Sequence, residues 1–142
     1  MAKEKSVTGY SGTPLVRKLG IRPGTTLLVR HEPKDYWDWI SPLPDAVTVK
    51  SRPTGGLDFV HLFFTRASDF KKEVLAARKS LAMDGMIWIS WPKKASRVET
   101  DLDENIIRDF ALQHGLVDVK VCAVDETWSG LKLVIPRHLR SA

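Results

Sequence analysis

Hydrophobic residues along the chain fall into short uninterrupted runs separated by polar segments. A continuous apolar run of five to eight residues is typical of a strand buried on both faces of a parallel sheet. Strict alternation of apolar and polar positions is instead typical of a strand with one face exposed. These patterns predict strands at 26–30, 46–49, 57–64, 86–91, 117–123 and 131–135.

Helical spacing appears between these strands. Phe70, Val74, Ala77 and Leu81 repeat every three or four residues, which predicts a helix that we expect Ser68 to cap and Asp84-Gly85 to end. A second helical stripe covers 102–111, where Thr100 and Asp103 resemble a capping box and Gly115 marks the stop. Shorter helical turns are predicted after Thr13-Pro14 and within 33–44.

The alternation of strands and helices favours an α/β fold with a mostly parallel sheet covered by helices on its faces. The last two strands are joined by a short turn containing Trp128-Ser129-Gly130, so we expect a C-terminal antiparallel hairpin at one edge. Residues 1–12 are mostly polar and are predicted to be a flexible N-terminus, followed by a single domain over 13–142.

Composition narrows the class of protein. Hydrophobic residues make up 43% of the 142 positions and charged residues 27%, as in globular proteins. No apolar run approaches the roughly 20 residues that span a bilayer, and the start of the chain is unlike a signal peptide, so we expect a cytoplasmic protein without membrane contact. The single cysteine, Cys122, excludes an internal disulfide and a multi-cysteine zinc site.

The second half of the chain resembles the Rossmann-like methyltransferases. Leu57-Asp58-Phe59-Val60 is similar to the strand that follows the adenine site in that family, and Met83–Trp88 resembles the entry to the next strand. The first half differs. Arg30–Lys34 stands where that family has a glycine-rich turn, and Lys50-Ser51-Arg52 stands where it has an acidic ribose-binding residue. One strand–helix unit is also missing. The resemblance therefore implies a methyltransferase-like fold with the cofactor half degraded, and we expect no bound S-adenosylmethionine and no other cofactor.

A second resemblance covers nearly the whole chain. Several long segments are similar to a small bacterial family that is known only as a domain of unknown function. The segments that carry this resemblance are 9–15, 18–21, 88–94, 100–102, 115–122 and 128–132.

Basic residues follow several of the predicted strands. Ligands of open parallel sheets sit beyond the carboxyl ends of the strands, where the strand order reverses. The predicted strand ends carry His31, Arg66, Lys93 and Lys94, with Trp91 and Trp37 as candidate walls. These six residues predict a crevice for an anionic ligand or a partner protein, near the N-terminus of the helix that follows Arg66. The alternative interpretation is a basic rim that is simply solvated.

Other chemistry has weaker support. His61 and Cys122 lie within apolar strands and are interpreted as structural, and the four histidines have no metal-ligand spacing. No nucleophile elbow or phosphate loop is present, so we assign no catalytic residue and no metal. The leading interpretation is a non-catalytic binding or regulatory domain. The alternatives are a small methyltransferase with an unorthodox S-adenosylmethionine site and, third, weak nucleic-acid binding through a net charge of +5 that is spread among acidic stretches.

Overall fold

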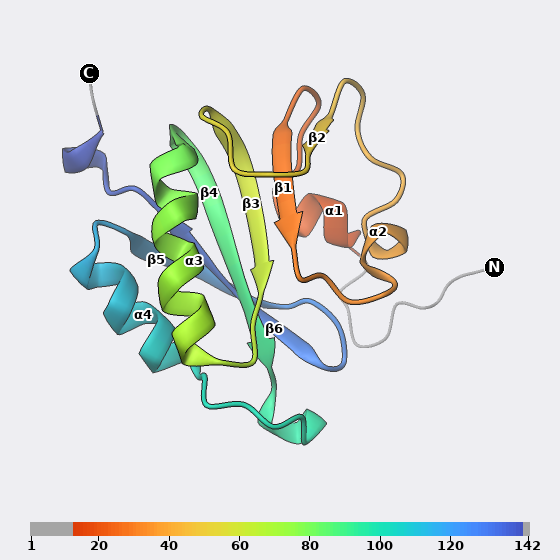
Figure 1. Cartoon of the computed structure of the whole chain (residues 1–142). Helices are drawn as coiled ribbons and strands as arrows, with labels where there is room; N and C mark the ends of the chain where they lie inside the picture. The colour runs from red at the N-terminus through yellow and green to blue at the C-terminus, as the bar shows by residue number, and fades with distance from the viewer. Residues whose placement is uncertain (1–12, 141–142) are drawn as a thin grey trace.

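Six strands form one mixed sheet in the computed structural model, which describes residues 13–140 (Figure 1). The order across the sheet is β2-β1-β3-β4-β6-β5. The strands are β1 (Thr26–Arg30), β2 (Thr48–Lys50), β3 (Leu57–Phe63), β4 (Leu81–Pro92), β5 (Val117–Ala123) and β6 (Trp128–Val134). The predicted flexible segment 1–12 lies outside the described residues.

The strand directions confirm the predicted fold class. Neighbours β2, β1, β3 and β4 are parallel, whereas β6 runs antiparallel to β4 and to β5. The last two strands therefore form the predicted antiparallel hairpin at one edge. Asp125 shapes its turn, because its carboxylate oxygen accepts hydrogen bonds from the backbone N–H groups of Thr127 and Trp128.

Helices cover both faces of the sheet. The helices α3 (Ala67–Ser80) and α4 (Glu104–Gln113) lie side by side on one face, and the short helices α1 (Leu15–Lys18) and α2 (Tyr36–Trp39) lie on the other (Figure 1). None of the helices in the described part of the chain is long and apolar enough to cross a bilayer. Side chains alternate between the faces along the strands, so the sheet separates two apolar cores.

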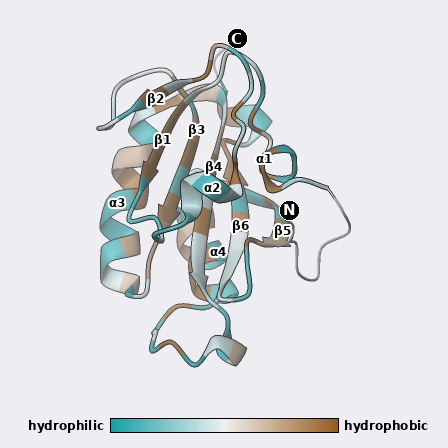
Figure 2. Cartoon of the chain, turned by 90° about the vertical axis from the view of Figure 1, so that its right-hand side faces the viewer, coloured by the Kyte–Doolittle hydropathy of each residue, from teal (hydrophilic) through white to brown (hydrophobic). Residues whose placement is uncertain are grey.

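The core under α3 and α4 includes Leu62, Ile87 and Phe70, and the core under α1 and α2 includes Phe59 and Trp88. Hydrophobic positions accordingly concentrate in β1 and β3, at the centre of the fold (Figure 2). Trp88 is fully buried, and its ring N–H donates to the carbonyl of Leu19 over 2.8 Å. This bond holds the end of α1 against the middle of the sheet.

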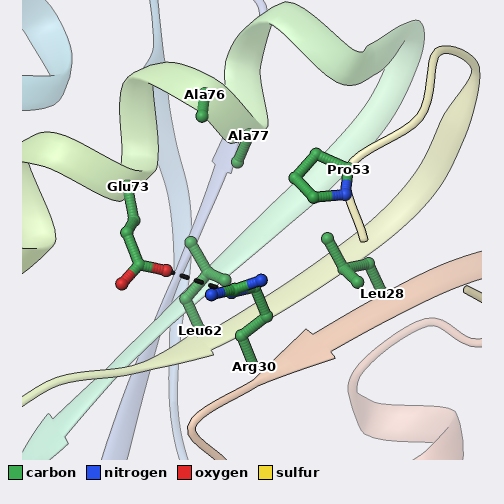
Figure 3. A pocket seen from close by; sticks show the side chains of 7 residues that line it. All are labelled: Leu28, Arg30, Pro53, Leu62, Glu73, Ala76 and Ala77. Atoms are coloured by element: carbon green, nitrogen blue, oxygen red, sulfur yellow. Dashed lines mark hydrogen bonds and ion pairs between the residues drawn. The ribbon is translucent and has the colours of Figure 1, made fainter. Parts of the chain in front are cut away.

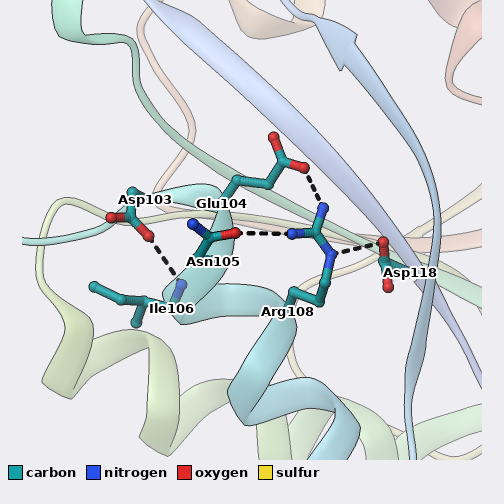
Figure 4. A network of polar contacts seen from close by, with 6 residues as sticks. All are labelled: Asp103, Glu104, Asn105, Ile106, Arg108 and Asp118. Carbon is teal, nitrogen blue, oxygen red and sulfur yellow. Dashed lines mark hydrogen bonds and ion pairs between the residues drawn. The ribbon is translucent and has the colours of Figure 1, made fainter.

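Helix α4 is tied to the hairpin by one arginine (Figure 4). Arg108 donates from Nε to Asp118 of β5 over 2.9 Å, from Nη1 to Asn105 over 3.0 Å, and from Nη2 to Glu104. The hydrogen bond to Asp118, followed by that to Glu104, raises the pKa of Arg108. The network sets the helix against the edge strand without using apolar contact.

Two predicted helix starts were wrong. Helix α3 begins at Ala67, and Arg66 rather than Ser68 occupies the N-cap position. Helix α4 begins at Glu104 with Asp103 as its N-cap, whose carboxylate accepts from the N–H of Ile106 over 2.9 Å. Thr100 is not part of a capping box, because its hydroxyl donates to the carbonyl of Thr65. Helix α4 is thus capped by its own Asp103, whereas the first turn of α3 is met by the carboxylate of Asp101 from a distant segment.

The transition from α3 to β4 also differs from the prediction. The helix ends at Ser80 and the strand begins at once, since Leu81 pairs with Leu57 before the register shifts. Gly85 lies inside the irregular part of the strand and not at a helix stop. A Cβ at Gly85 would lie 2.8 Å from the carbonyl oxygen of Leu57 and from the side chain of Leu81, so only glycine allows this close approach of the two strands.

Candidate functional site

A cavity of about 400 Å³ opens at the carboxyl ends of β1 and β3. The chain leaves β1 toward β2 on one side, and β3 lies on the other side, so the strand order reverses here. Ligands of open α/β sheets bind at such a switch point. This strand-end crevice is lined by His31, Phe63, Phe64, Thr65, Asp69, Glu73 and Trp128.

The turn after β1 has an unusual backbone. His31 has a φ of +64°, in the left-handed region that favours glycine. Its ring Nε2 lies 2.7 Å from Oε2 of Glu73, and Arg30 Nε donates to Oε1 of the same carboxylate over 3.2 Å. Glu73 comes from the middle of α3, so one acidic side chain pairs with two basic residues from the end of β1.

The second cavity adjoins this ion pair (Figure 3). It has a volume of about 280 Å³ and is lined by Leu28, Arg30, Pro53, Leu62, Glu73, Ala76 and Ala77. Arg30 reaches across it from β1 to Glu73 on α3 (Figure 3). Glu73 lines both cavities, so its ion pairs with Arg30 and His31 lie between them.

Aromatic rings make up much of the remaining wall. Phe63 and Trp128 meet edge to face with ring centroids 5.1 Å apart, and the His31 ring lies 5.7 Å from that of Phe64. Asp69 adds a second carboxylate, one helical turn before Glu73 on α3. The crevice therefore combines flat apolar walls with two acidic groups, of which Glu73 is paired with Arg30 and His31.

Of the six residues predicted to form this crevice, His31 lines it and the other five do not. Arg66 and Lys94 are exposed, the first at the N-cap of α3 and the second in a 3₁₀ turn after β4. Lys93 points to the hairpin turn, where its Nζ donates to the carbonyl of Asp125 over 2.7 Å.

The two tryptophans also lie elsewhere. Trp91 is buried in the core under α3 and α4, with 7% of its surface exposed. Trp37 packs against the core under α1 and α2, and its ring N–H donates to Glu32 over 3.0 Å. Both side chains contribute to packing in the structure.

The N-terminus of α3 is partly occupied by the protein itself. The backbone N–H of Ala67 donates to a carboxylate oxygen of Asp101 over 2.7 Å. The Asp101 N–H in turn donates to the Thr65 carbonyl over 3.2 Å. An internal carboxylate thus takes the place near this helix end where an external anion was predicted.

Glu73 and Asp69 were not among the predicted site residues. The sequence signal for them is their spacing of four residues near the start of α3, which places both carboxylates on one helix face. Only the packing of α3 across β1 and β3 shows that the acidic face is the one turned to the strand ends.

A buried chain of polar groups lies in the core under α1 and α2. The ring of His61 is completely buried, with Nδ1 2.9 Å from the hydroxyl of Tyr36 and Nε2 2.8 Å from that of Ser90. The ring also stacks on Phe63, with centroids 4.4 Å apart. Burial lowers the pKa of His61 to about 3 and raises that of Tyr36, to which the nearby charge of Glu32 adds. His61 is therefore a neutral, satisfied core histidine, as its apolar strand predicted.

Cys122 is half-buried on β5. Burial raises the pKa of its thiol, while the positive charges of Lys18 and Lys120 act in the opposite direction. Within residues 13–140 no three histidine, cysteine or acidic side chains gather in a way that would hold a metal ion.

Solved structures with the same fold include several methyltransferases and complexes with SAH. DhpI in complex with SAH has a TM-score of 0.62 and 13% identity, over 87% of this chain and 83% of that one. The magnesium protoporphyrin IX methyltransferase of Synechocystis PCC 6803 with bound SAH has a TM-score of 0.57 and 11% identity, over 86% and 78%. A SAM-dependent methyltransferase from Aquifex aeolicus has a TM-score of 0.53 and 15% identity, over 86% and 88%. At this identity the likeness shows the fold alone.

The turn beside the crevice has no glycine that would let the backbone approach S-adenosylmethionine closely. No glycine lies between Gly24 and Gly55, and the left-handed turn after β1 carries the His31 side chain instead. That side chain and Glu73 fill the place where a backbone would approach the cofactor. The strand after the turn, β2, ends at Lys50 and is followed by Ser51 and Arg52 rather than by an acidic residue.

Comparison with curated proteins finds no match. A family model covers residues 47–137, which is more than half of the chain and includes β2 to β6, α3 and α4. The predicted resemblance to a family without an assigned function is thereby confirmed. The chain belongs to the family described as "Protein of unknown function (DUF3052)".

Proposed function

We propose that this protein is a non-catalytic binding domain that uses the strand-end crevice for a flat, amine-bearing molecule. The observation that carries the proposal is the composition of the crevice at the switch point of the sheet. Phe63, Phe64 and Trp128 offer faces and edges of aromatic rings, and Asp69 offers a carboxylate. Binding sites of this kind are concave and mostly apolar, with a few polar groups that fix the orientation of the ligand.

The charge of the crevice favours a donor or cation over an anion. Glu73 already contacts both Arg30 and His31, so an anion in the crevice could reach either of these two groups only by breaking those contacts. Asp69 has no ion-pair partner among the described residues. A ligand amine beside Asp69 would form a charge-assisted hydrogen bond, which is about twice as strong as a neutral one.

Fragment binding tests this proposal directly. Aromatic amines and aromatic carboxylates matched in size are compared by ligand-observed NMR at constant ionic strength. We expect the amines to bind and the carboxylates not to bind. Asp69→Asn is expected to weaken amine binding about tenfold, while Asp109→Asn, on the exposed side of α4, leaves it unchanged. Preference for the carboxylates would contradict the proposal and support the anionic crevice predicted from the sequence.

The second candidate function is that of a small methyltransferase. It is supported by the similarity in fold to solved structures with bound SAH. Calorimetric titration with S-adenosylmethionine separates the two. The crowded turn at His31 predicts no binding in the micromolar range. Micromolar affinity that is lost in Asp69→Asn would show that the crevice holds the cofactor by another arrangement and would favour the enzyme.

A further inference from the structure

The second cavity, between α3 and β1, is a space of its own beside the strand-end crevice (Figure 3). Glu73 is the one residue that lines both. The other walls of the second cavity come from β1, β3, α3 and the loop between β2 and β3, which contributes Pro53. The small side chains of Ala76 and Ala77 leave the space open where α3 passes over β1.

Most of the second cavity has apolar walls. Leu28 and Leu62 line it from the sheet and Ala77 lines it from α3, and all three belong to the buried core under α3 and α4. An apolar cavity of roughly 150 Å³ holds benzene, which has six non-hydrogen atoms. The volume of about 280 Å³ therefore suits a ligand of about ten non-hydrogen atoms with an aliphatic part.

Arg30 and Glu73 make one end of the second cavity polar. The Arg30 guanidinium has five N–H groups, of which that of Nε donates to Glu73. The four on Nη1 and Nη2 have no acceptor among the described residues, and the guanidinium points into the cavity (Figure 3). The Glu73 carboxylate contacts Arg30 and His31, and its two oxygens can accept about four hydrogen bonds in all. Donors and acceptors are therefore both left at this end.

We propose that the second cavity binds a short aliphatic carboxamide, independently of any ligand in the strand-end crevice. A primary amide is neutral and carries an acceptor and a donor in one group. Its carbonyl accepts from the Nη groups of Arg30, its N–H donates to Glu73, and its alkyl chain lies against Leu28 and Leu62. Glu73 repels a carboxylate in this position and Arg30 repels an ammonium, so the ion pair selects the neutral group.

Three probes with the same alkyl chain test the selectivity: hexanamide, hexanoate and protonated hexylamine. Each is titrated into the protein at fixed ionic strength and followed by two-dimensional NMR of the backbone amides. We expect hexanamide to shift the signals of Leu28, Leu62 and Ala77, which line the second cavity. Hexanamide should bind there about fivefold more tightly than either charged probe, because neither of its polar atoms meets a like charge.

Two substitutions separate binding from folding. Glu73→Gln removes the negative charge while Arg30 remains, so hexanoate should bind this variant about fivefold more tightly than it binds the parent. A misfolded variant would not gain affinity. Ala76→Leu fills the cavity from an exposed position on α3 and should abolish the hexanamide shifts. Lys79→Leu, also exposed on α3 but outside the cavity, is the matched control and should bind hexanamide as the parent does.

Three results would overturn the proposal. The first is that hexanamide, up to its solubility limit, leaves the signals of the cavity residues unchanged. The second is that hexanoate binds the parent at this cavity as tightly as hexanamide does. The third is that Ala76→Leu binds hexanamide as the parent does. Asp69→Asn should leave hexanamide binding intact, and Ala76→Leu should leave amine binding in the strand-end crevice intact, so failure at one site is distinguishable from failure at the other.

Discussion

Two histidines of the same sheet region show how strongly the surroundings decide the chemistry of a residue. His61 is enclosed by apolar rings and bonded to two hydroxyls, and it stays neutral. His31 lies at the end of β1, exposed, with a carboxylate 2.7 Å away. Neither role depends on neighbours in sequence, because Glu73, Tyr36 and Ser90 all arrive from other elements.

The buried histidine makes stability depend on pH. His61 has a pKa of about 3 in the folded protein and an ordinary value of 6.5. Between these values the unfolded chain takes up a proton that the folded protein does not, so the free energy of unfolding decreases as the pH falls. The contribution of His61 is complete above pH 6.5 and is lost progressively toward pH 3.

Urea denaturation of the parent and of His61→Gln at a series of pH values measures this effect. The parent should be more stable at pH 7, because the variant disturbs the buried hydrogen bonds. The difference between the two should narrow on acidification, since only the parent carries the group that must stay neutral. A difference that is constant or grows between pH 7 and pH 4 would contradict the assignment.

Element boundaries in this fold are decided by contacts at the ends of helices and strands. Helix α4 begins where the Asp103 carboxylate accepts a backbone hydrogen bond. Helix α3 instead begins beside the Asp101 carboxylate, which comes from a segment that follows β4. The strand β4 starts immediately after α3, because Leu81 already pairs with Leu57.

Capping provides a matched pair of substitutions. Asp103→Ala removes the N-cap bond to Ile106 and should lower the free energy of unfolding by about 1 kcal/mol. Ser68→Ala should change it by less than about 0.5 kcal/mol, because Ser68 is exposed and is not the N-cap. Equal effects of the two substitutions in thermal or urea unfolding would be inconsistent with the observed caps.

The close approach of β3 and β4 at Gly85 allows a second test at the level of secondary structure elements. Gly85→Ala would place a methyl group 2.8 Å from the Leu57 carbonyl oxygen, and should cost about 1–3 kcal/mol of stability. Gly55→Ala is the control, since nothing lies within 4 Å of a Cβ there. Denaturant midpoints of both variants test the prediction, and a neutral Gly85→Ala would show that β3 and β4 separate more easily than the structure indicates.

Across the whole molecule, the strands of the sheet differ in how deeply they are buried. The central strands β3 and β4 lie between two apolar cores, whereas β2 has three residues at one edge and all of them are exposed. The other edge, β5, is interrupted by a register shift next to Lys120, and such features discourage pairing with foreign strands.

Hydrogen exchange should follow this uneven burial. Amide protons of β3 and β4 are expected to exchange last, through global unfolding, and those of β2 first, through local opening. Exchange followed by NMR or mass spectrometry at several denaturant concentrations would show the order. Protection of β2 equal to that of β3 would mean that the sheet opens as one unit.

The sequence alone was sufficient for the class and order of the elements. Buried runs and alternating segments depend only on neighbouring positions, so 57–63 and 117–123 were predicted within a residue or without error. The helix 67–80 was predicted for the same reason, although its N-cap was expected two residues later, at Ser68, and its end at Asp84-Gly85. The antiparallel hairpin followed from the shortness of its turn, because parallel strands need a longer crossover.

The tertiary structure decided which charges meet. Basic residues at the strand ends were expected to gather, but Lys93 turns to a backbone carbonyl and His31 pairs with Glu73. Meanwhile Lys120 and Lys132 lie opposite each other through the register of the hairpin, and the ammonium of Lys120 donates to the backbone carbonyl of Lys18. The physical reason is the distance along the chain over which each property is set, because hydrophobic periodicity depends only on residues that are close in sequence. The balance of charge at a site depends on groups brought from distant segments, whose register and packing no local pattern specifies.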